Sequence, residues 1–128
     1  MTKLSEKELF KIRDYLKRKK EMILRKDQQL FLKAKVDFDK IVLMIIKEYK
    51  PKRIYQWGSL LKKENFSTIS DIDIAIEGIT DPKKYFRLLG EADALTKFPL
   101  DIVQIEKIHP FHAKSIKEKG KVIYEEKK

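Results

Sequence analysis

Three aspartates lie within apolar segments of the second half of the chain. Asp71 and Asp73 stand in SDIDIAIEG, and Asp101 stands in FPLDIVQIE. Because residues two apart in a strand share a face, Asp71 and Asp73 point to one side and the isoleucines between and after them to the other. Two bare carboxylates at this spacing repel each other, and water, a basic partner or a divalent cation relieves the repulsion. If the two strands are neighbours, all three carboxylates meet at one end of a small sheet.

A divalent cation suits such an oxygen-rich site. Mg²⁺ is typically held by one or two carboxylates together with substrate phosphates. The pair Gly58-Ser59 offers a place for phosphates, because glycine lets a phosphate approach the backbone and a serine hydroxyl with freed amides can hold it. Alone, an Asp-x-Asp pair on an edge strand is more often a solubility device, and a Gly-Ser pair an ordinary turn. The Gly-Ser pair followed by the Asp-x-Asp pair, in this order, favours a site for a metal ion and phosphates.

The chain around these residues has the patterns of an α/β (α+β) protein. Four segments are β-prone or alternate with period two: 53–57, 71–77, 100–105 and 122–124. Asp81-Pro82 predicts the start of a helix that ends before Pro99. His109-Pro110 predicts the start of a shorter helix closed by Gly120. These elements must bring the aspartates together.

The first fifty residues contain neither glycine nor proline and carry a helical pattern. Ser5 and Glu8 form a capping box, and Pro51 ends the pattern. Between them, apolar residues recur at spacings of three, four and seven. Because one helix of this length is unusual in a small domain, we expect a break near Lys26–Gln28, with Asp27 as a new cap.

Composition limits the classes of protein. The chain has 128 residues and 30 Lys and Arg against 20 Asp and Glu, a formal net charge of +10 that lies mostly before Lys50. Such a charge invites an anionic partner, although a Lys- and Glu-rich chain is also typical of heat-adapted surfaces. With no cysteine and no apolar run approaching a membrane span, we expect no disulfide, thiolate zinc site, signal peptide or membrane helix, and a cytoplasmic location.

The set of motifs resembles the minimal nucleotidyltransferases of the DNA polymerase β superfamily. Their signature is a Gly-Ser turn, then Asp-x-Asp, then a third Asp on a later strand, and here the matching residues are Gly58-Ser59, Asp71-Ile72-Asp73 and Asp101. The resemblance implies a small mixed β-sheet of the nucleotidyltransferase type packed with helices, formed by residues 38–128. Residues 1–37 would be an added helical extension that packs on the core or forms a homodimer.

The resemblance also implies roles for these residues. Asp71 and Asp73 would bind a metal pair, and Asp101 would complete the metal site and help to activate the attacking hydroxyl. Gly58 and Ser59 would hold the β and γ phosphates of ATP or another nucleoside triphosphate. Two Mg²⁺ ions, with Mn²⁺ as a substitute, would stabilise the attacking and leaving oxygens during transfer of a nucleoside monophosphate.

The segment after Gly-Ser departs from the family pattern. The family commonly continues Gly-Ser-x-Ala-Arg-Gly, whereas this chain has Leu-Leu-Lys-Lys at 60–63, which puts Lys62 at the arginine position and lacks the second glycine. Lysine keeps the charge needed to bind the nucleotide but not the bidentate fork. Together with Lys52 and Arg53, Lys62 and Lys63 are expected to bracket the proposed phosphate site, where they could steer a triphosphate.

Three aromatic side chains have alternative interpretations. His109 and His112 have a spacing compatible with a shared metal, but without a third ligand nearby, capping and surface roles are favoured. Trp57 directly precedes the Gly-Ser turn and could stack on a base, although packing beneath the sheet is favoured.

Two functions from different classes remain. In the first, the chain is an enzyme that transfers AMP from ATP to a hydroxyl acceptor. Short family members resemble the antitoxin of HEPN/MNT toxin–antitoxin modules, so a tyrosine of a partner toxin is the first acceptor. In the second, the chain is a catalytically weak binding module that associates with RNA or a partner protein through its basic helices.

Overall fold

The computed structural model describes residues 3–62 and 70–127 of the chain. Its centre is a four-stranded mixed sheet with the strand order β3-β2-β1-β4. The strands are β1 (Arg53–Trp57), β2 (Ile72–Glu77), β3 (Leu100–Gln104) and β4 (Lys121–Glu125). β1 pairs antiparallel with β2 and β4, and β2 pairs parallel with β3. The expected mixed sheet is confirmed.

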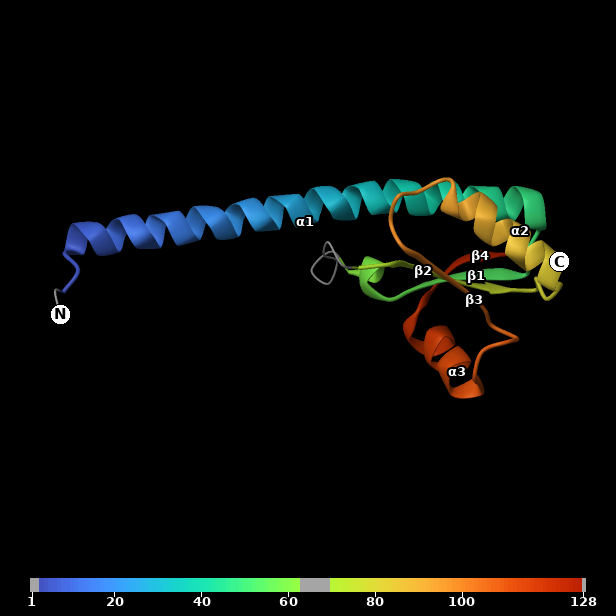
Figure 1. Ribbon diagram of the computed structural model, residues 1–128. Coiled ribbons are helices and arrows are strands. Elements are labelled where there is room, and N and C mark those ends of the chain that lie inside the picture. Colours follow the sequence, from blue (N-terminus) through green and yellow to red (C-terminus); the bar gives the residue numbers. More distant parts are fainter. Residues whose placement is uncertain (1–2, 63–69, 128) are drawn as a thin grey trace.

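Helices cover both faces of this sheet (Figure 1). α2 (Pro82–Asp93) begins at the Asp81 cap and lies beside the end of α1 on one face, and α3 (Pro110–Lys119) lies on the other. A single 3-10 turn, η1 (Ser59–Leu61), follows β1. In the described residues, no helix combines the length and the apolar character needed to cross a membrane.

Helix α1 (Glu6–Tyr49) is continuous over 44 residues, so the predicted break near Lys26–Gln28 is wrong. The helix starts at the expected capping box of Ser5 and Glu8 and ends at Lys50, which has a left-handed backbone (φ 48) before Pro51. Asp27 does not act as a cap, because the residues around it favour the helix and none of them is glycine or proline. A residue able to cap does not stop a helix by itself.

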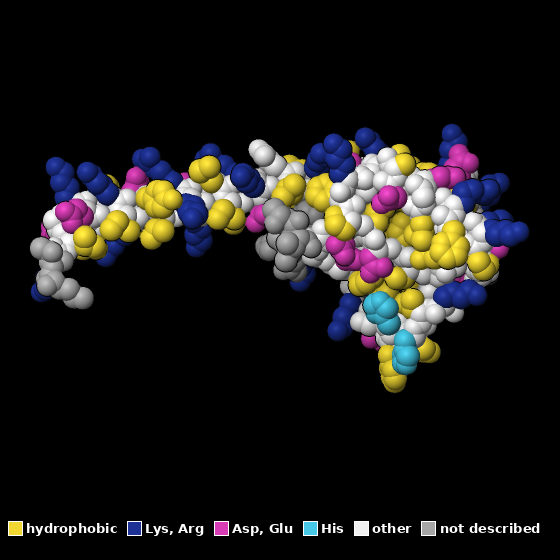
Figure 2. Space-filling view, viewed as in Figure 1, with side chains coloured by type: hydrophobic (Ala, Val, Ile, Leu, Met, Phe, Trp, Pro, Cys, Tyr) yellow, Lys and Arg dark blue, Asp and Glu magenta, His cyan; other side chains and the backbone are white. Residues whose placement is uncertain are grey.

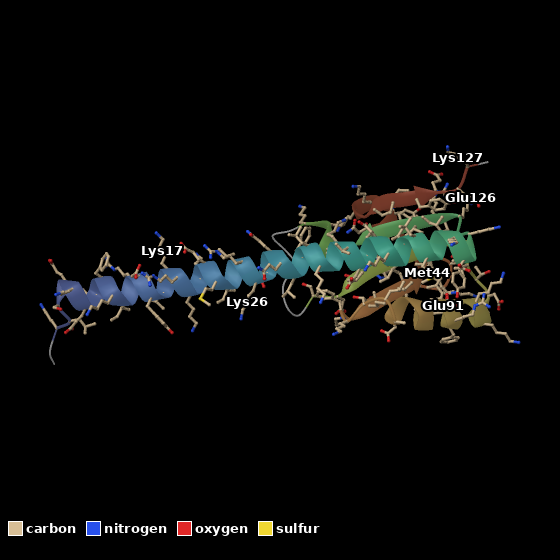
Figure 3. The ribbon with its side chains drawn as sticks, turned by 90° about the horizontal axis from the view of Figure 1, so that it is seen from above. Lys17, Lys26, Met44, Glu91, Glu126 and Lys127 are labelled. Carbon is tan, nitrogen blue, oxygen red and sulfur yellow. The ribbon has the colours of Figure 1, made fainter. Side chains whose placement is uncertain are left out.

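The two parts of α1 differ in their surroundings. Residues 30–49 pack on the sheet and bury Ala34, Phe38, Ile41 and Ile45. Residues 6–29, called here the projecting segment, extend beyond the end of the sheet from which β1 leads into η1 (Figures 1 and 3). Large apolar side chains are exposed along it: Leu9, Phe10, Ile12, Tyr15, Leu16, Met22, Ile23 and Leu24. Figure 2 shows apolar and basic side chains interspersed along this segment.

Alternation along β2 separates the two cores of the molecule. Ile72, Ile74 and Ile76 are fully buried in the larger cluster, which includes residues of α1 and α2. Ala75 belongs to a smaller cluster with Ile116 of α3. Residues of odd number in β2 therefore face α3, and the three aspartates belong to this face or its edge.

Candidate functional site

Asp73 and Asp101 lie side by side at one end of the sheet. The parallel register of β2 and β3 pairs Asp73 with Asp101, so their Cα atoms are separated by about one strand spacing, roughly 4.8 Å. The expectation that the two strands are neighbours is confirmed. Asp71 precedes β2 by one residue and is exposed, whereas Asp73 and Asp101 are partly buried.

Gly58 lies directly against the carboxylate of Asp73. The glycine follows Trp57, which pairs with Asp73 across β1 and β2. Its φ of +79 is unfavourable for residues with a side chain, and a Cβ added there would collide with Oδ2 of Asp73. Glycine is thus required here both by the turn and by the close approach to the carboxylate.

The electrostatics of Asp73 are those of a carboxylate that lacks a cation. Burial, followed by the negative charges of Asp101 and Asp71, raises the pKa of Asp73 to about 7. Within residues 3–62 and 70–127, none of the three aspartates forms an ion pair. Burial and then Asp101 also raise the pKa of Tyr85, whose hydroxyl donates to the carbonyl of Ile102.

These carboxylates fit a divalent cation whose remaining ligands come from a bound substrate. In the described part of the chain, no three acidic or histidine side chains converge as a closed metal site would require. Asp73 and Asp101 are neighbours, and the cradle at Gly58 lets another group approach the same carboxylate. Two carboxylates with phosphate oxygens are the usual donors for Mg²⁺. Asp71 acts on Asp73 through its charge and lies at the edge of this pair.

The other predicted phosphate contacts lie next to Gly58. Ser59 is half-buried at the start of η1, and Lys62 is exposed directly after the turn, with its amide donating to the carbonyl of Ser59. Lys63, and with it residues 63–69 of the linker, lies outside the described residues. Lys52 and Arg53 lie at the opposite end of β1, so the expectation that they bracket the site is wrong. Strand β1 separates them from Gly58 in space.

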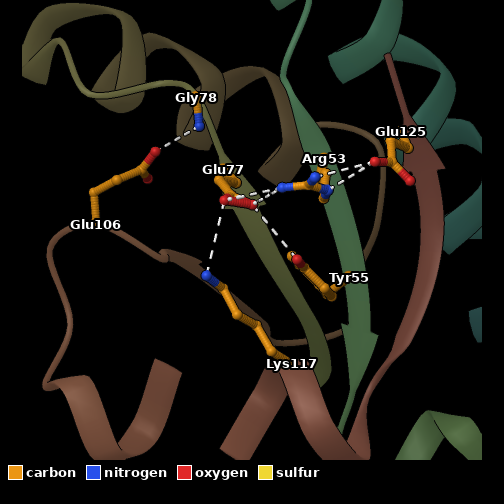
Figure 4. Close-up of polar contacts among 7 residues, drawn as sticks. All are labelled: Arg53, Tyr55, Glu77, Gly78, Glu106, Lys117 and Glu125. Carbon is orange, nitrogen blue, oxygen red and sulfur yellow. Dashed lines mark hydrogen bonds and ion pairs between the residues drawn. The ribbon is translucent and has the colours of Figure 1, made fainter. Parts of the chain in front are cut away.

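A second group of charged residues lies at that opposite end, and the sequence did not reveal it. Glu77 is 8% exposed and accepts hydrogen bonds from Arg53 at 3.1 Å and from the hydroxyl of Tyr55 at 3.4 Å (Figure 4). Lys117 of α3 lies 3.9 Å from the same carboxylate, and Arg53 also pairs with Glu125 at 3.1 Å. Because these charges neutralise each other, this group fixes strand and helix positions.

The aromatic residues near the site are only partly as expected. His109 caps α3 by accepting from the amide of Phe111, as predicted. Trp57 packs on the smaller core, as predicted, and its ring meets the ring of His112 edge-on at 5.1 Å. The contact between Trp57 and His112 was missed, because the sequence gives no sign that α3 returns to the end of β1.

Comparison with known families identifies one match. The model of the family described as "Polymerase beta, Nucleotidyltransferase" matches residues 39–128, which include Asp71, Asp73, Asp101 and Gly58. No curated protein sequence gives a significant match.

Solved structures with a similar fold are toxin–antitoxin complexes. A crystal structure of the MntA-HepT toxin–antitoxin has a TM-score of 0.55 at 19% identity, over 72% of this chain and 73% of that one. The structure of a tri-AMPylated Shewanella oneidensis HEPN toxin in complex with MNT antitoxin has a TM-score of 0.55 at 19% identity, over 73% of each chain. A crystal structure of a toxin–antitoxin with AMP-PNP has a TM-score of 0.56 at 20% identity, over 69% of this chain and 73% of that one. At these identities the similarity establishes the fold.

Proposed function

Because the chain belongs to the polymerase β nucleotidyltransferase family, we propose that it transfers AMP from ATP to a hydroxyl group of a partner protein in a metal-dependent reaction. The observation that carries this proposal is the pairing of Asp73 with Asp101 in register, with Gly58 against the carboxylate of Asp73. An uncompensated carboxylate pair of this kind stabilises no fold, since like charges repel. Its use is to bind a cation together with an anionic substrate.

In the proposed reaction, the acceptor oxygen forms a bond to the α-phosphorus and the bond from that phosphorus to the β-phosphate oxygen breaks. Asp73 and Asp101 would hold Mg²⁺, with Asp71 at the edge, and the bound metal would supply Lewis-acid stabilisation of the attacking and leaving oxygens. Asp101 would take up the proton of the acceptor hydroxyl and pass it to water. Gly58 and Ser59 would contact the β and γ phosphates, and Lys62 would add charge to the leaving pyrophosphate.

For the acceptor we propose a tyrosine of a partner toxin. One structural neighbour is a tri-AMPylated HEPN toxin in complex with its MNT antitoxin, which supports a protein acceptor. The projecting segment of α1 also supports a protein partner, because its exposed apolar side chains extend past the end of the sheet that carries the site. A protein seated on that segment would lie close to Asp73 and Asp101.

The alternative function is a binding module without strong catalysis. The observation in its favour is charge: residues 6–29 contain nine Lys and Arg against five Asp and Glu. Such a segment attracts anionic partners, including RNA. RNA binding that persists in Asp73→Asn and Asp101→Asn variants, in the absence of any nucleotide transfer, would favour this alternative.

Transfer of label from α-³²P-ATP tests the proposal directly. The purified chain is incubated with Mg²⁺ or Mn²⁺ and with a helical toxin-like protein encoded beside it, or with RNA, and compared with Asp73→Asn and with Asp39→Asn. Asp39 is an exposed aspartate of α1 outside the site and serves as the matched control. We expect label on the protein acceptor with the wild type and Asp39→Asn and none with Asp73→Asn. Absence of label on every acceptor, together with no ATP binding, would contradict the proposal.

A further inference from the structure

A small pocket lies between the end of β1 and helix α3. Its volume is ≈ 200 Å³, and Trp57, Gly58 and Leu61 line one side. One face of α3 lines the other side, with His112, Ile116 and Lys119 among its residues. The pocket is outside the carboxylate pair, and the proposed reaction assigns it no role.

The pocket and the carboxylates share a wall. Trp57 pairs with Asp73 across β1 and β2, and both side chains belong to the sheet face that α3 covers. Gly58 lines the pocket and also lies against Oδ2 of Asp73. A molecule bound at Asp73 therefore needs to pass only Gly58 to reach the pocket.

The indole of Trp57 carries a hydrogen-bond donor that none of the described residues uses. Its Nε1 atom is buried and has no hydrogen-bond partner among the described residues. Buried donors without a partner are rare, because each loses its bonds to water without replacement. With the imidazole of His112 edge-on to the indole and Ile116 beside it, the pocket offers aromatic and apolar walls. These walls suit a flat aromatic ring.

We propose that this pocket binds the nucleobase of the nucleoside triphosphate, with Trp57, His112 and Ile116 forming the aromatic and apolar walls that contact the base. This inference rests on the proposed function. The volume is below the roughly 300 Å³ at which pockets begin to hold complete small ligands, so it takes one ring system while the ribose and phosphates lie outside. Those phosphates would then extend past Gly58 to the carboxylates.

The alternative ring, the side chain of an acceptor tyrosine, does not suit this position. In an in-line displacement the acceptor attacks from the side opposite to the leaving pyrophosphate. The pyrophosphate is assigned to Gly58 and Ser59, and Gly58 is a wall of the pocket. An acceptor ring in the pocket would therefore lie on the leaving-group side of the α-phosphorus.

The test compares ATP with ribose 5′-triphosphate, which has the same triphosphate but no base. Dissociation constants are measured by calorimetry with Mg²⁺ for the wild type, Trp57→Phe and His112→Ala. Trp57 is the single tryptophan of the chain, so its fluorescence in the wild type reports on the pocket directly. The matched control is Phe111→Ala, because Phe111 neighbours His112 in sequence but is 80% exposed.

We expect the wild type to bind ATP at least about tenfold more tightly than ribose triphosphate, as loss of the aromatic and apolar contacts of the base would give. Trp57→Phe and His112→Ala should remove most of this preference without changing the affinity for ribose triphosphate, and Phe111→Ala should keep it. ATP should change the fluorescence of the wild type, and ribose triphosphate should not.

Equal affinities of the wild type for the two ligands would overturn the nucleobase pocket and leave the proposed function intact. The same conclusion would follow if Trp57→Phe or His112→Ala weakened both ligands alike. Failure of both ligands to bind the wild type would overturn the proposed function together with this inference. If Trp57→Phe does not fold, His112→Ala decides the outcome, since His112 is exposed on α3.

Discussion

The two ends of strand β2 carry acidic side chains on the same face of the sheet, but in opposite electrostatic settings. At one end Glu77 is nearly buried and contacts Arg53, Tyr55 and Lys117. At the other end Asp73 is half-buried beside Asp101 and has no ion pair within the described residues. The first carboxylate is neutralised by the protein, whereas the second has no neutralising partner among the described residues.

This difference separates a structural from a functional use of the same chemistry. A buried ion pair with hydrogen bonds fixes the relative positions of strands, because removing one partner leaves the other charge unpaired. A pair of like charges destabilises the fold, which agrees with the proposed use of this pair in ligand binding.

Removing a carboxylate at the Asp73 end of β2 should abolish AMP transfer without lowering the free energy of unfolding. Asp101→Asn should lower AMP transfer by roughly 10³-fold, because a lost metal site removes several kcal/mol of transition-state stabilisation. Its midpoint of urea unfolding should stay unchanged or rise, since Asp73 loses a like-charged neighbour. Label transfer and urea titration measure the two effects. If the Asp101→Asn variant transferred AMP as fast as the wild type, Asp101 would not belong to the catalytic site.

Removing the carboxylate at the Glu77 end of β2 should lower the free energy of unfolding and leave AMP transfer intact. Glu77→Ala should lower the free energy of unfolding by about 3 kcal/mol, because Arg53 and Lys117 lose their shared partner in a nearly buried position. The variant should keep its activity below its unfolding temperature. Glu118→Ala is the control, since Glu118 is exposed and its ion pair, with the exposed Lys114 at 3.9 Å, is a surface pair. A loss for Glu77→Ala no larger than that for Glu118→Ala would refute the structural role.

Adding one methyl group between the turn and the carboxylate should damage both stability and function. Gly58→Ala should cost about 2 kcal/mol, from the backbone strain at φ +79 and from displacement of Asp73. The affinity for Mg²⁺ with ATP should fall at the same time. Gly90→Ala is the matched control, because an added Cβ there meets nothing within 4 Å and alanine favours the interior of α2. The Gly90 variant should be as stable as the wild type or more so.

The smallest effect is on the pH dependence of stability. The pKa of Asp73 in the folded state, about 7, exceeds its ordinary value of 3.8, so the folded state binds more protons between these limits. Stability should therefore fall as the pH rises from about 4 to 8, by roughly 1–2 kcal/mol once the partial exposure of the group is taken into account. Urea unfolding in EDTA at pH 5 and pH 8 measures this change, which Asp73→Asn should reduce and Mg²⁺ should offset at high pH.

Local signals in the sequence predicted most of the elements. The capping box at Ser5, the Asp81-Pro82 and His109-Pro110 helix starts, and the buried isoleucines of β2 are all present as expected. Each depends on residues within a few positions of one another. The predicted break at Asp27 failed because a rule about typical helix length competed with an unbroken run of helix-favouring residues, and the local propensities prevailed.

The sequence alone determined that Gly58, Ser59 and the three aspartates belong to one family pattern, because their types and order are written along the chain. Only the tertiary structure decided which carboxylates the protein itself neutralises. Arg53 is closer to Gly58 in sequence than Asp101 is, yet strand β1 carries it to the far end, where it neutralises Glu77. The parallel pairing of β2 with β3 brings Asp101 to Asp73 instead. Strand pairing joins residues that are distant in sequence, and the charge around each carboxylate depends on which strands meet.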